Sequence, residues 1–111
     1  MPIAKSITKY VRISPRKARL AAGLIRGRGV EEASQQLAFS PLRASRLLAK
    51  TLDTAVANAE TQLNVQRRDL VVKEVRIDEG PTMKRAKSKN RGGTVPVMKR
   101  TSHFTVAVAA K

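Results

Sequence analysis

Few side chains in this sequence could carry out catalysis, and their spacing does not favour it. His103 is the only histidine and there is no cysteine, so a metal site or a nucleophile with a paired base would lack partners. Asp78 and Glu79 are adjacent in a strand-like segment, which points their carboxylates to opposite faces. Glu31 and Glu32 begin a helix-like segment, where their charge suits the positive end of the helix. The sequence therefore predicts a protein that is not an enzyme and needs no metal or other cofactor.

Positive charge is the chemistry that the chain does offer. The 111 residues include 23 Lys and Arg against 8 Asp and Glu, a formal net charge of +15 at pH 7. Residues 1–29 and 80–111 each carry eight cations and no acid, whereas residues 30–79 carry seven cations and eight acids. Because such a charge opposes compaction until an anion neutralises it, we expect a polyanionic partner. Disordered basic tails would share this composition, but both ends also carry the periodic patterns of folded elements.

The N-terminal basic end is predicted to form a strand and then a helix. Residues 3–13 alternate, with Ile7 and Val11 on one face, which is typical of a strand. Ser14-Pro15 supplies a capping hydroxyl and a first-turn proline, and these start a helix. Alanines occupy one stripe of this helix and arginines the other side. We expect the helix to end at Gly27 and Gly29.

Two further helices are predicted in the neutral middle of the chain. Val30, Ala33 and Leu37 mark a short one. A second Ser-Pro pair starts a longer one, at about residues 41–63. Its apolar face has helical period and is formed by Ala44, Leu47, Leu48, Leu52, Ala55, Val56, Ala59 and Leu63. Arg43, Arg46 and Lys50 lie on the opposite face, which we interpret as solvated.

Alternation returns at residues 70–78 and 101–109, and these strands complete the predicted fold. The fold class is α+β in a single domain over residues 1–111, with three helices packed on a small three-stranded antiparallel sheet. Residues 80–100 are too long for an ordinary loop and have Gly92-Gly93 near their middle, so they predict a protruding β-hairpin arm. The arm carries seven cations and would extend roughly 30 Å. It has no core, so we expect it to be disordered when free or ordered by insertion into something anionic.

Five segments, taken together and in order, resemble the family of the bacterial ribosomal large-subunit protein L-twenty-two. They read SPRKARL at residues 14–20, LIRG at 24–27, AVANAE at 55–60, DEGPTMKR at 78–85 and KRTSH at 99–103. The resemblance covers nearly the whole chain. At the tip of the arm the chain departs from the common family pattern, with Ser88-Lys89-Asn90 followed by Arg91-Gly92-Gly93, and Pro96 in the returning strand is less usual.

The resemblance implies a body that binds large-subunit ribosomal RNA early in assembly, next to other ribosomal proteins. It also implies that the arm lines the nascent-peptide exit tunnel and meets the nascent peptide there. The residues expected to contact RNA are Lys9, Arg12, Arg16, Lys17, Arg19, Arg26, Arg28, Lys84, Arg85, Lys87, Lys89, Arg91, Lys99, Arg100, Ser102 and His103. Those expected to line the tunnel are Met83, Lys84, Arg85, Lys89, Asn90, Arg91 and Gly92, of which the first three affect macrolide response in the family.

From the resemblance we also expect a ribosome-bound cytoplasmic protein that does not form homo-oligomers. Lys and Arg would neutralise phosphates and release counterions, and the folded shape of the RNA would supply specificity. Three aromatic residues are too few for a platform that stacks single-stranded bases.

The sequence leaves two other classes of protein open. The first is a basic architectural DNA-binding protein whose arms grip a duplex, with Pro96 as a wedge. Such proteins dimerise, so a monomer that prefers folded RNA would exclude it. The second is a membrane-surface or peptide-chaperone module, which the small, Ala-rich face of the long helix fits poorly. No membrane span is expected, because the longest uncharged stretches have ten residues, about half of the roughly 20 needed.

Overall fold

The computed structural model describes residues 3–88 and 93–110 of the chain. The elements occur in the order β1 (Ile3–Val11), α1 (Pro15–Ala22), α2 (Val30–Phe39), α3 (Arg43–Leu63), the 3-10 turn η1 (Arg67–Asp69), β2 (Leu70–Glu79), β3 (Met83–Ser88), β4 (Thr94–Lys99) and β5 (Ser102–Ala110).

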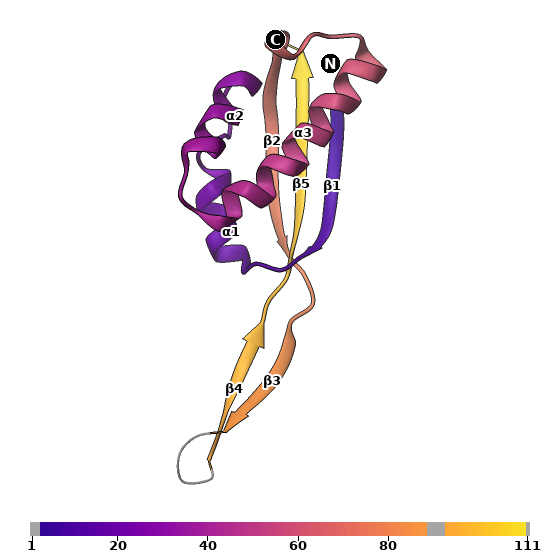
Figure 1. The fold of residues 1–111 in the computed structure, drawn as a ribbon. Coiled ribbons are helices and arrows are strands. Elements are labelled where there is room, and N and C mark those ends of the chain that lie inside the picture. Colours follow the sequence, from indigo (N-terminus) through magenta and orange to yellow (C-terminus); the bar gives the residue numbers. More distant parts are fainter. Residues whose placement is uncertain (1–2, 89–92, 111) are drawn as a thin grey trace.

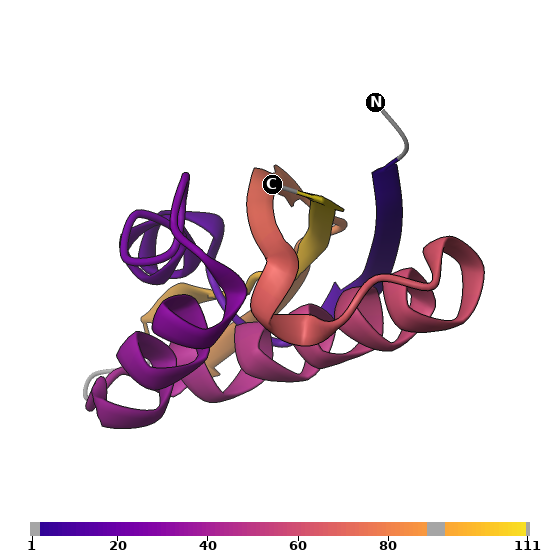
Figure 2. The same ribbon diagram turned by 90° about the horizontal axis from the view of Figure 1, so that it is seen from above.

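A three-stranded antiparallel sheet, in the order β1–β5–β2, forms the base of the body. Helix α3 runs obliquely across one face of this sheet, while α1 and α2 lie toward the β2 side (Figures 1 and 2). Strands β3 and β4 pair separately, from Met83 opposite Lys99 to Ser88 opposite Thr94, and extend away from the body as an arm. The molecule is therefore elongated, 62 × 24 × 16 Å. The predicted α+β fold with a protruding hairpin is confirmed.

The core lies between α3 and the sheet. Phe104, Val106 and Val108 of β5 are fully buried there, as are Leu48 and Leu52 of α3. The predicted apolar stripe of α3 is thus the stripe that packs inward.

On β1 the residues that are buried are the small ones. Ala4 and Ser6 are buried, whereas Ile3 and Ile7 are exposed on the other face of the sheet. On this buried side of the strand the hydroxyls of Thr8 and Thr51 lie 2.8 Å apart, so small polar side chains join β1 to α3.

Helix α1 has the predicted start and buried face but ends earlier than predicted. The Ser14 hydroxyl caps it by accepting a hydrogen bond from the Lys17 N–H. After Ala22 the bonding becomes tighter, because Leu24 N–H donates to Ala21 O at 3.0 Å instead of continuing the α-helical pattern. Gly27 then adopts a left-handed φ of 78° in the turn that follows. The prediction that the helix ends at Gly27 and Gly29 is therefore wrong: these glycines lie in the connection to α2.

Two other boundaries also differ. Helix α3 begins at Arg43, because the Ser40-Pro41 pair remains in the connection, where the Ser40 hydroxyl accepts a hydrogen bond from the Leu42 N–H. Strand β1 ends at Val11, just after a bulge in which two residues, Lys9 and Tyr10, lie opposite the single residue His103.

Candidate nucleic-acid interface

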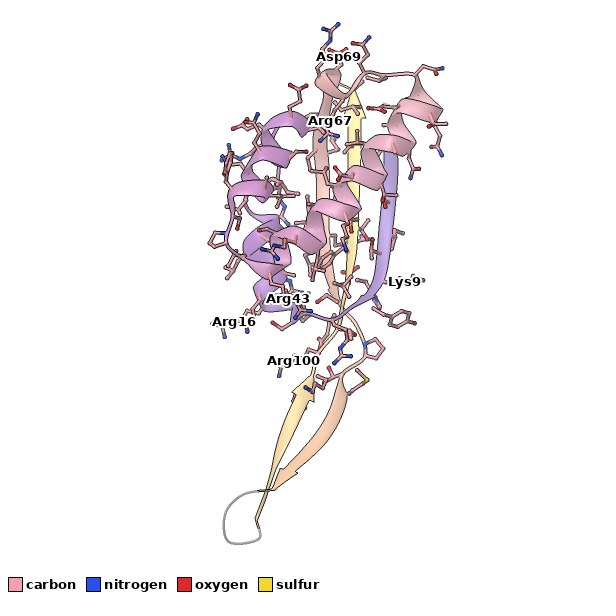
Figure 3. The ribbon with its side chains drawn as sticks, viewed as in Figure 1. Lys9, Arg16, Arg43, Arg67, Asp69 and Arg100 are labelled. Atoms are coloured by element: carbon pink, nitrogen blue, oxygen red, sulfur yellow. The ribbon has the colours of Figure 1, made fainter. Side chains whose placement is uncertain are left out.

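A cationic groove of about 800 Å³ lies where the arm joins the body. Five of the eight residues that line it are Lys or Arg and none is acidic. We call it the neck groove and define it by these five cations: Arg12, Lys17, Arg43, Lys99 and Arg100. Figure 3 shows Arg43 on the body side of this junction and Arg100 on its arm side. Arg16 and Lys9 lie at the same end of the body.

The ends of four elements bring these cations together. Arg12 follows the end of β1, Lys17 lies in the first turn of α1, and Arg43 is the first residue of α3. Lys99 is the last residue of β4 and Arg100 follows it, so the arm supplies the remaining wall. All five side chains are exposed, and none forms an ion pair within the described part of the chain. The groove therefore gathers cations that no acid of the described body neutralises.

Two helices begin at this groove, which increases its preference for anions. The first turns of α1 and α3 contain no acidic residue, and α3 has no side-chain cap. The N-terminal end of a helix carries a partial positive charge and unpaired N–H groups, and it is a common site for phosphate. Chemically the groove can bind the phosphates of a polymer backbone through charge and charge-assisted hydrogen bonds.

Other cations predicted to contact RNA lie outside the groove and bond within the protein. The guanidiniums of Arg19 and Arg26 donate to the carbonyl oxygens of Ile77 at 3.2 Å and of Val75 at 2.8 Å, and so tie α1 and the turn after it to β2. Arg28 is paired with Glu32. Each guanidinium has five N–H donors, so these arginines keep donors for other acceptors.

Lys99 and Arg100 of the arm line the groove, and the other predicted arm residues divide into three groups. Met83 is half-buried at the start of β3 and Lys84 is exposed beside it. Arg85 and Lys87 belong to β3. The remaining predicted arm residues, Lys89, Asn90, Arg91 and Gly92, lie outside the described residues.

Two predicted RNA-contacting residues of β5 also bond inside the protein. Ser102 is fully buried and its hydroxyl donates to Ile13 O at 2.7 Å. His103 is half-buried and its Nδ1 accepts a hydrogen bond from the Tyr10 N–H at 3.1 Å. The other predicted body cations, Lys9 and Arg16, are exposed at the arm-side end.

Arg43 is the groove residue that sequence reasoning assigned to a solvated face. A signal for it was present, because a cation in the first turn of a helix opposes the helix dipole. Because Arg43 does not stabilise the start of α3, its presence there indicates that its charge serves to bind an anion outside the helix.

Neither a metal-binding cluster nor a membrane-spanning helix is found in the described residues. Among residues 3–88 and 93–110, no group of three or more His, Cys, Asp or Glu side chains could hold a metal ion. Within the same ranges, no helix has the length and apolar character needed to cross a membrane.

The fold and the site define a small basic protein that combines an α+β body, a projecting two-stranded arm and an acid-free cationic groove between them. The family described as Ribosomal protein L22p/L17e matches residues 6–109 of the chain. A protein named large ribosomal subunit protein uL22 from Protochlamydia amoebophila is 70% identical over 109 residues, which is 98% of each chain. Proteins of the same name from Chlamydia abortus and Chlamydia muridarum are 61% and 60% identical over 107 residues, 96% of each chain. The chain belongs to the ribosomal protein L22p/L17e family, whose members are structural proteins and not enzymes.

Proposed function

We propose that this protein is a structural constituent of the large ribosomal subunit and binds ribosomal RNA through the neck groove. The neck groove is the observation that carries the proposal, since five cations and two helix N-termini meet there without an acid. Its natural ligand is an RNA backbone, because closely spaced phosphates match closely spaced cations. The fit of the body to folded RNA then gives the specificity that phosphate contacts alone lack.

The exposed cations around the groove extend this contact surface. Lys9 and Arg16 lie at the same end of the body. Arg19 of α1 and Arg26 and Arg28 in the turn after it are also exposed, and we include them in this surface. Ser102 is left out because its hydroxyl is buried and already bonded. Ribosome-bound, the protein would act in the bacterial cytoplasm next to other ribosomal proteins and would join the subunit early in assembly.

The arm is proposed to line the nascent-peptide exit tunnel, a role that family resemblance implies. Its proposed lining residues are Met83, Lys84 and Arg85 at the base, with Lys89, Asn90, Arg91 and Gly92 beyond them. Support comes from its shape, since an arm of two paired strands can enter a narrow space that a globular body cannot.

The RNA-binding proposal is tested by comparing a ribosomal RNA fragment with a DNA duplex of equal length. We expect the free protein to remain monomeric and to prefer the folded RNA. We also expect its affinity to fall steeply with salt, with a log–log slope that reflects several released counterions. A flat salt dependence would contradict the role of the groove, and a dimer that prefers the duplex would favour an architectural DNA-binding protein.

The tunnel proposal is tested by deleting Met83-Lys84-Arg85. Ala86 would then take the place of Met83 opposite Lys99, and a shift by three residues swaps the two faces of that strand. The body keeps its eight N-terminal cations, so we expect the variant to enter large subunits with a changed response to erythromycin or changed elongation arrest. Purified ribosomes are assayed for occupancy and for translation with and without the drug.

Deletion of Lys84-Arg85 alone is the matched control, because it removes the same two charges but shifts the strand by two residues and keeps its faces. We expect a smaller change in drug response for this control. Normal occupancy with an unchanged response in the three-residue variant would exclude these residues from the tunnel wall. Loss of occupancy would show that assembly needs the arm.

A further inference from the structure

The arm and the sheet of the body are joined by two single-chain connections, residues 80–82 and 100–101, which we call the neck. The ladder of β2, β5 and β1 ends at the neck, and β3 and β4 form a separate two-stranded sheet beyond it. One backbone hydrogen bond, from the Gly80 N–H to Thr101 O, joins the two connections, and no longer ladder continues from the body into the arm within the described residues. Two single chains can pivot, so something else must set the direction of the arm.

Three consecutive residues, the last of the neck and the first two of β5, each bond a different segment of the chain. The Thr101 hydroxyl donates to Pro81 O at 2.7 Å, and the Ser102 hydroxyl donates to Ile13 O at 2.7 Å. His103 Nδ1 accepts a hydrogen bond from the Tyr10 N–H at 3.1 Å. The first bond links the two connections of the neck, and the other two link β5 to β1 and to the residues that follow it.

The bond to His103 compensates for an unusual backbone at Tyr10. Tyr10 has a left-handed φ of 59°, and it lies in the bulge of β1 opposite His103. A bulge leaves a backbone N–H without its ladder partner, and here the imidazole accepts that N–H. The two rings also meet edge to face, with centroids 5.0 Å apart. His103 thus contacts the strained Tyr10 through both a hydrogen bond and a ring contact. Strain that is compensated in this way indicates that the local backbone geometry has a function.

Gly80 completes the neck by allowing close approach. Its N–H donates to Thr101 O at 3.0 Å. A Cβ at this position would lie 2.5 Å from the Thr101 hydroxyl and 3.2 Å from the His103 ring. Only glycine leaves both side chains free to make their bonds.

We propose that Thr101, Ser102 and His103 form a brace that fixes the direction of the arm relative to the body. In this proposal they are positioning residues, a role that differs from the RNA contact that the sequence predicts for Ser102 and His103. The brace also sets the two walls of the neck groove, because Arg12 lies between Tyr10 and Ile13 and Arg100 precedes Thr101. This consequence rests on the proposed function: an arm held in place loses less conformational freedom when RNA binds.

The brace predicts that the arm has a defined direction in the free protein, whereas the sequence alone predicts an arm that is disordered until it meets an anion. It is tested on the free protein, without RNA, by measuring one distance between body and arm. The chain has no cysteine, so Thr61→Cys at an exposed position of α3 and Gly93→Cys near the far end of the arm accept two spin labels specifically. About seven residues separate Gly93 from the neck, roughly 23 Å, so a 30° swing would move the label by about 12 Å. Pulsed electron paramagnetic resonance resolves such a change, and bending within the arm affects all variants equally.

The brace variants are Thr101→Val and His103→Ala, which remove a donor and an acceptor. We expect each to broaden or shift the distance distribution by about 5 Å or more, which is a swing of some 10–15°. Thr101→Ser and His103→Asn keep a hydroxyl and an acceptor at similar positions, so both should stay close to the parent. Ser34→Ala is the matched control, because it removes a hydroxyl that bonds Arg67 in the body, away from the neck.

The decisive comparison uses variants with unchanged helical circular dichroism. Parent-like distributions for both Thr101→Val and His103→Ala would overturn the brace, as would a parent distribution already as broad as theirs. If His103→Ala does not fold, Thr101→Val decides alone, since valine has nearly the shape of threonine. Because no RNA is present, failure here leaves the RNA-binding proposal untouched, and failure of RNA binding leaves the brace untouched.

Discussion

The arm-side end of the body and its opposite end both carry arginines, but these arginines have different surroundings. At the opposite end, the Arg67 guanidinium donates to the Ser34 hydroxyl at 2.6 Å and lies 3.8 Å from an Asp53 oxygen (Figure 3). At the arm-side end, Arg43 and Arg100 line a groove without an acid. The open face of the sheet resembles the opposite end, since Arg76 lies between Glu74 and Asp78.

The difference separates cations that belong to the fold from cations that need an external anion. An arginine with an acid or hydroxyl within reach has its charge satisfied locally, although an exposed pair adds little stability. Five cations gathered without an acid repel one another, so the free protein gains nothing from their proximity. The proposed RNA-binding end is therefore identified by the absence of acids around its cations, and not by the number of cations alone.

A single core holds both ends of the body in place. Leu52→Asp disrupts this core, so we expect it to have the largest effect on stability of all the variants. Leu52 is fully buried between α3 and the sheet. An unpaired charge there should cost about 3–5 kcal/mol of unfolding free energy, enough to unfold a small domain. Thermal melting followed by circular dichroism measures the loss.

Ala57→Asp is the control for this prediction, because Ala57 is exposed on the same helix. We expect its melting temperature to stay near that of the parent. An unchanged melting temperature for Leu52→Asp would mean that α3 packs by a different face.

The face of α3 could be predicted from the sequence because burial and helical period follow the same pattern. Leu48, Leu52 and Ala55 recur at helical spacing and are all fully buried. The helix boundaries were harder, since Ser-Pro and glycine signals are local and fit more than one nearby start or stop. Ser40-Pro41 fits a helix start but lies in the connection before α3.

The groove and the neck could not be predicted because long-range placement creates them. All five groove cations are visible in the sequence, but only the meeting of four element ends makes them neighbours. The bond between Tyr10 and His103 spans 93 residues. A left-handed tyrosine has no local sequence signal, because it depends on how β1 pairs with β5.

The next largest effect should come from neutralising unpaired and paired cations in matched sets. The groove set is Arg43→Gln and Arg100→Gln. The paired set is Arg67→Gln and Arg76→Gln, which removes the same charge from residues that have acidic partners and lie outside the proposed RNA-binding surface.

Binding of a ribosomal RNA fragment is measured for both sets across a range of salt concentrations. We expect the groove set to lower the log–log slope by about 2 and the affinity at low salt by roughly 10–100-fold. The paired set should change both much less. Equal losses for the two sets would mean that net charge governs binding and that the neck groove has no special role.

The smallest effect concerns stability, and its sign differs between the two ends. Arg67→Gln removes a partly buried hydrogen bond to Ser34, so we expect a loss of about 0.5–1.5 kcal/mol of unfolding free energy.

Arg43→Gln removes a cation from the first turn of α3, where it opposes the helix dipole and lies among four other cations. We therefore expect a gain of about 0.3–1 kcal/mol at low salt. The gain should shrink as salt screens the repulsion, with a Debye length of about 10 Å at 0.1 M. Urea unfolding at two salt concentrations measures both variants. A loss of stability in Arg43→Gln similar to that in Arg67→Gln would show that Arg43 supports the fold, and the contrast between the two ends would then fail.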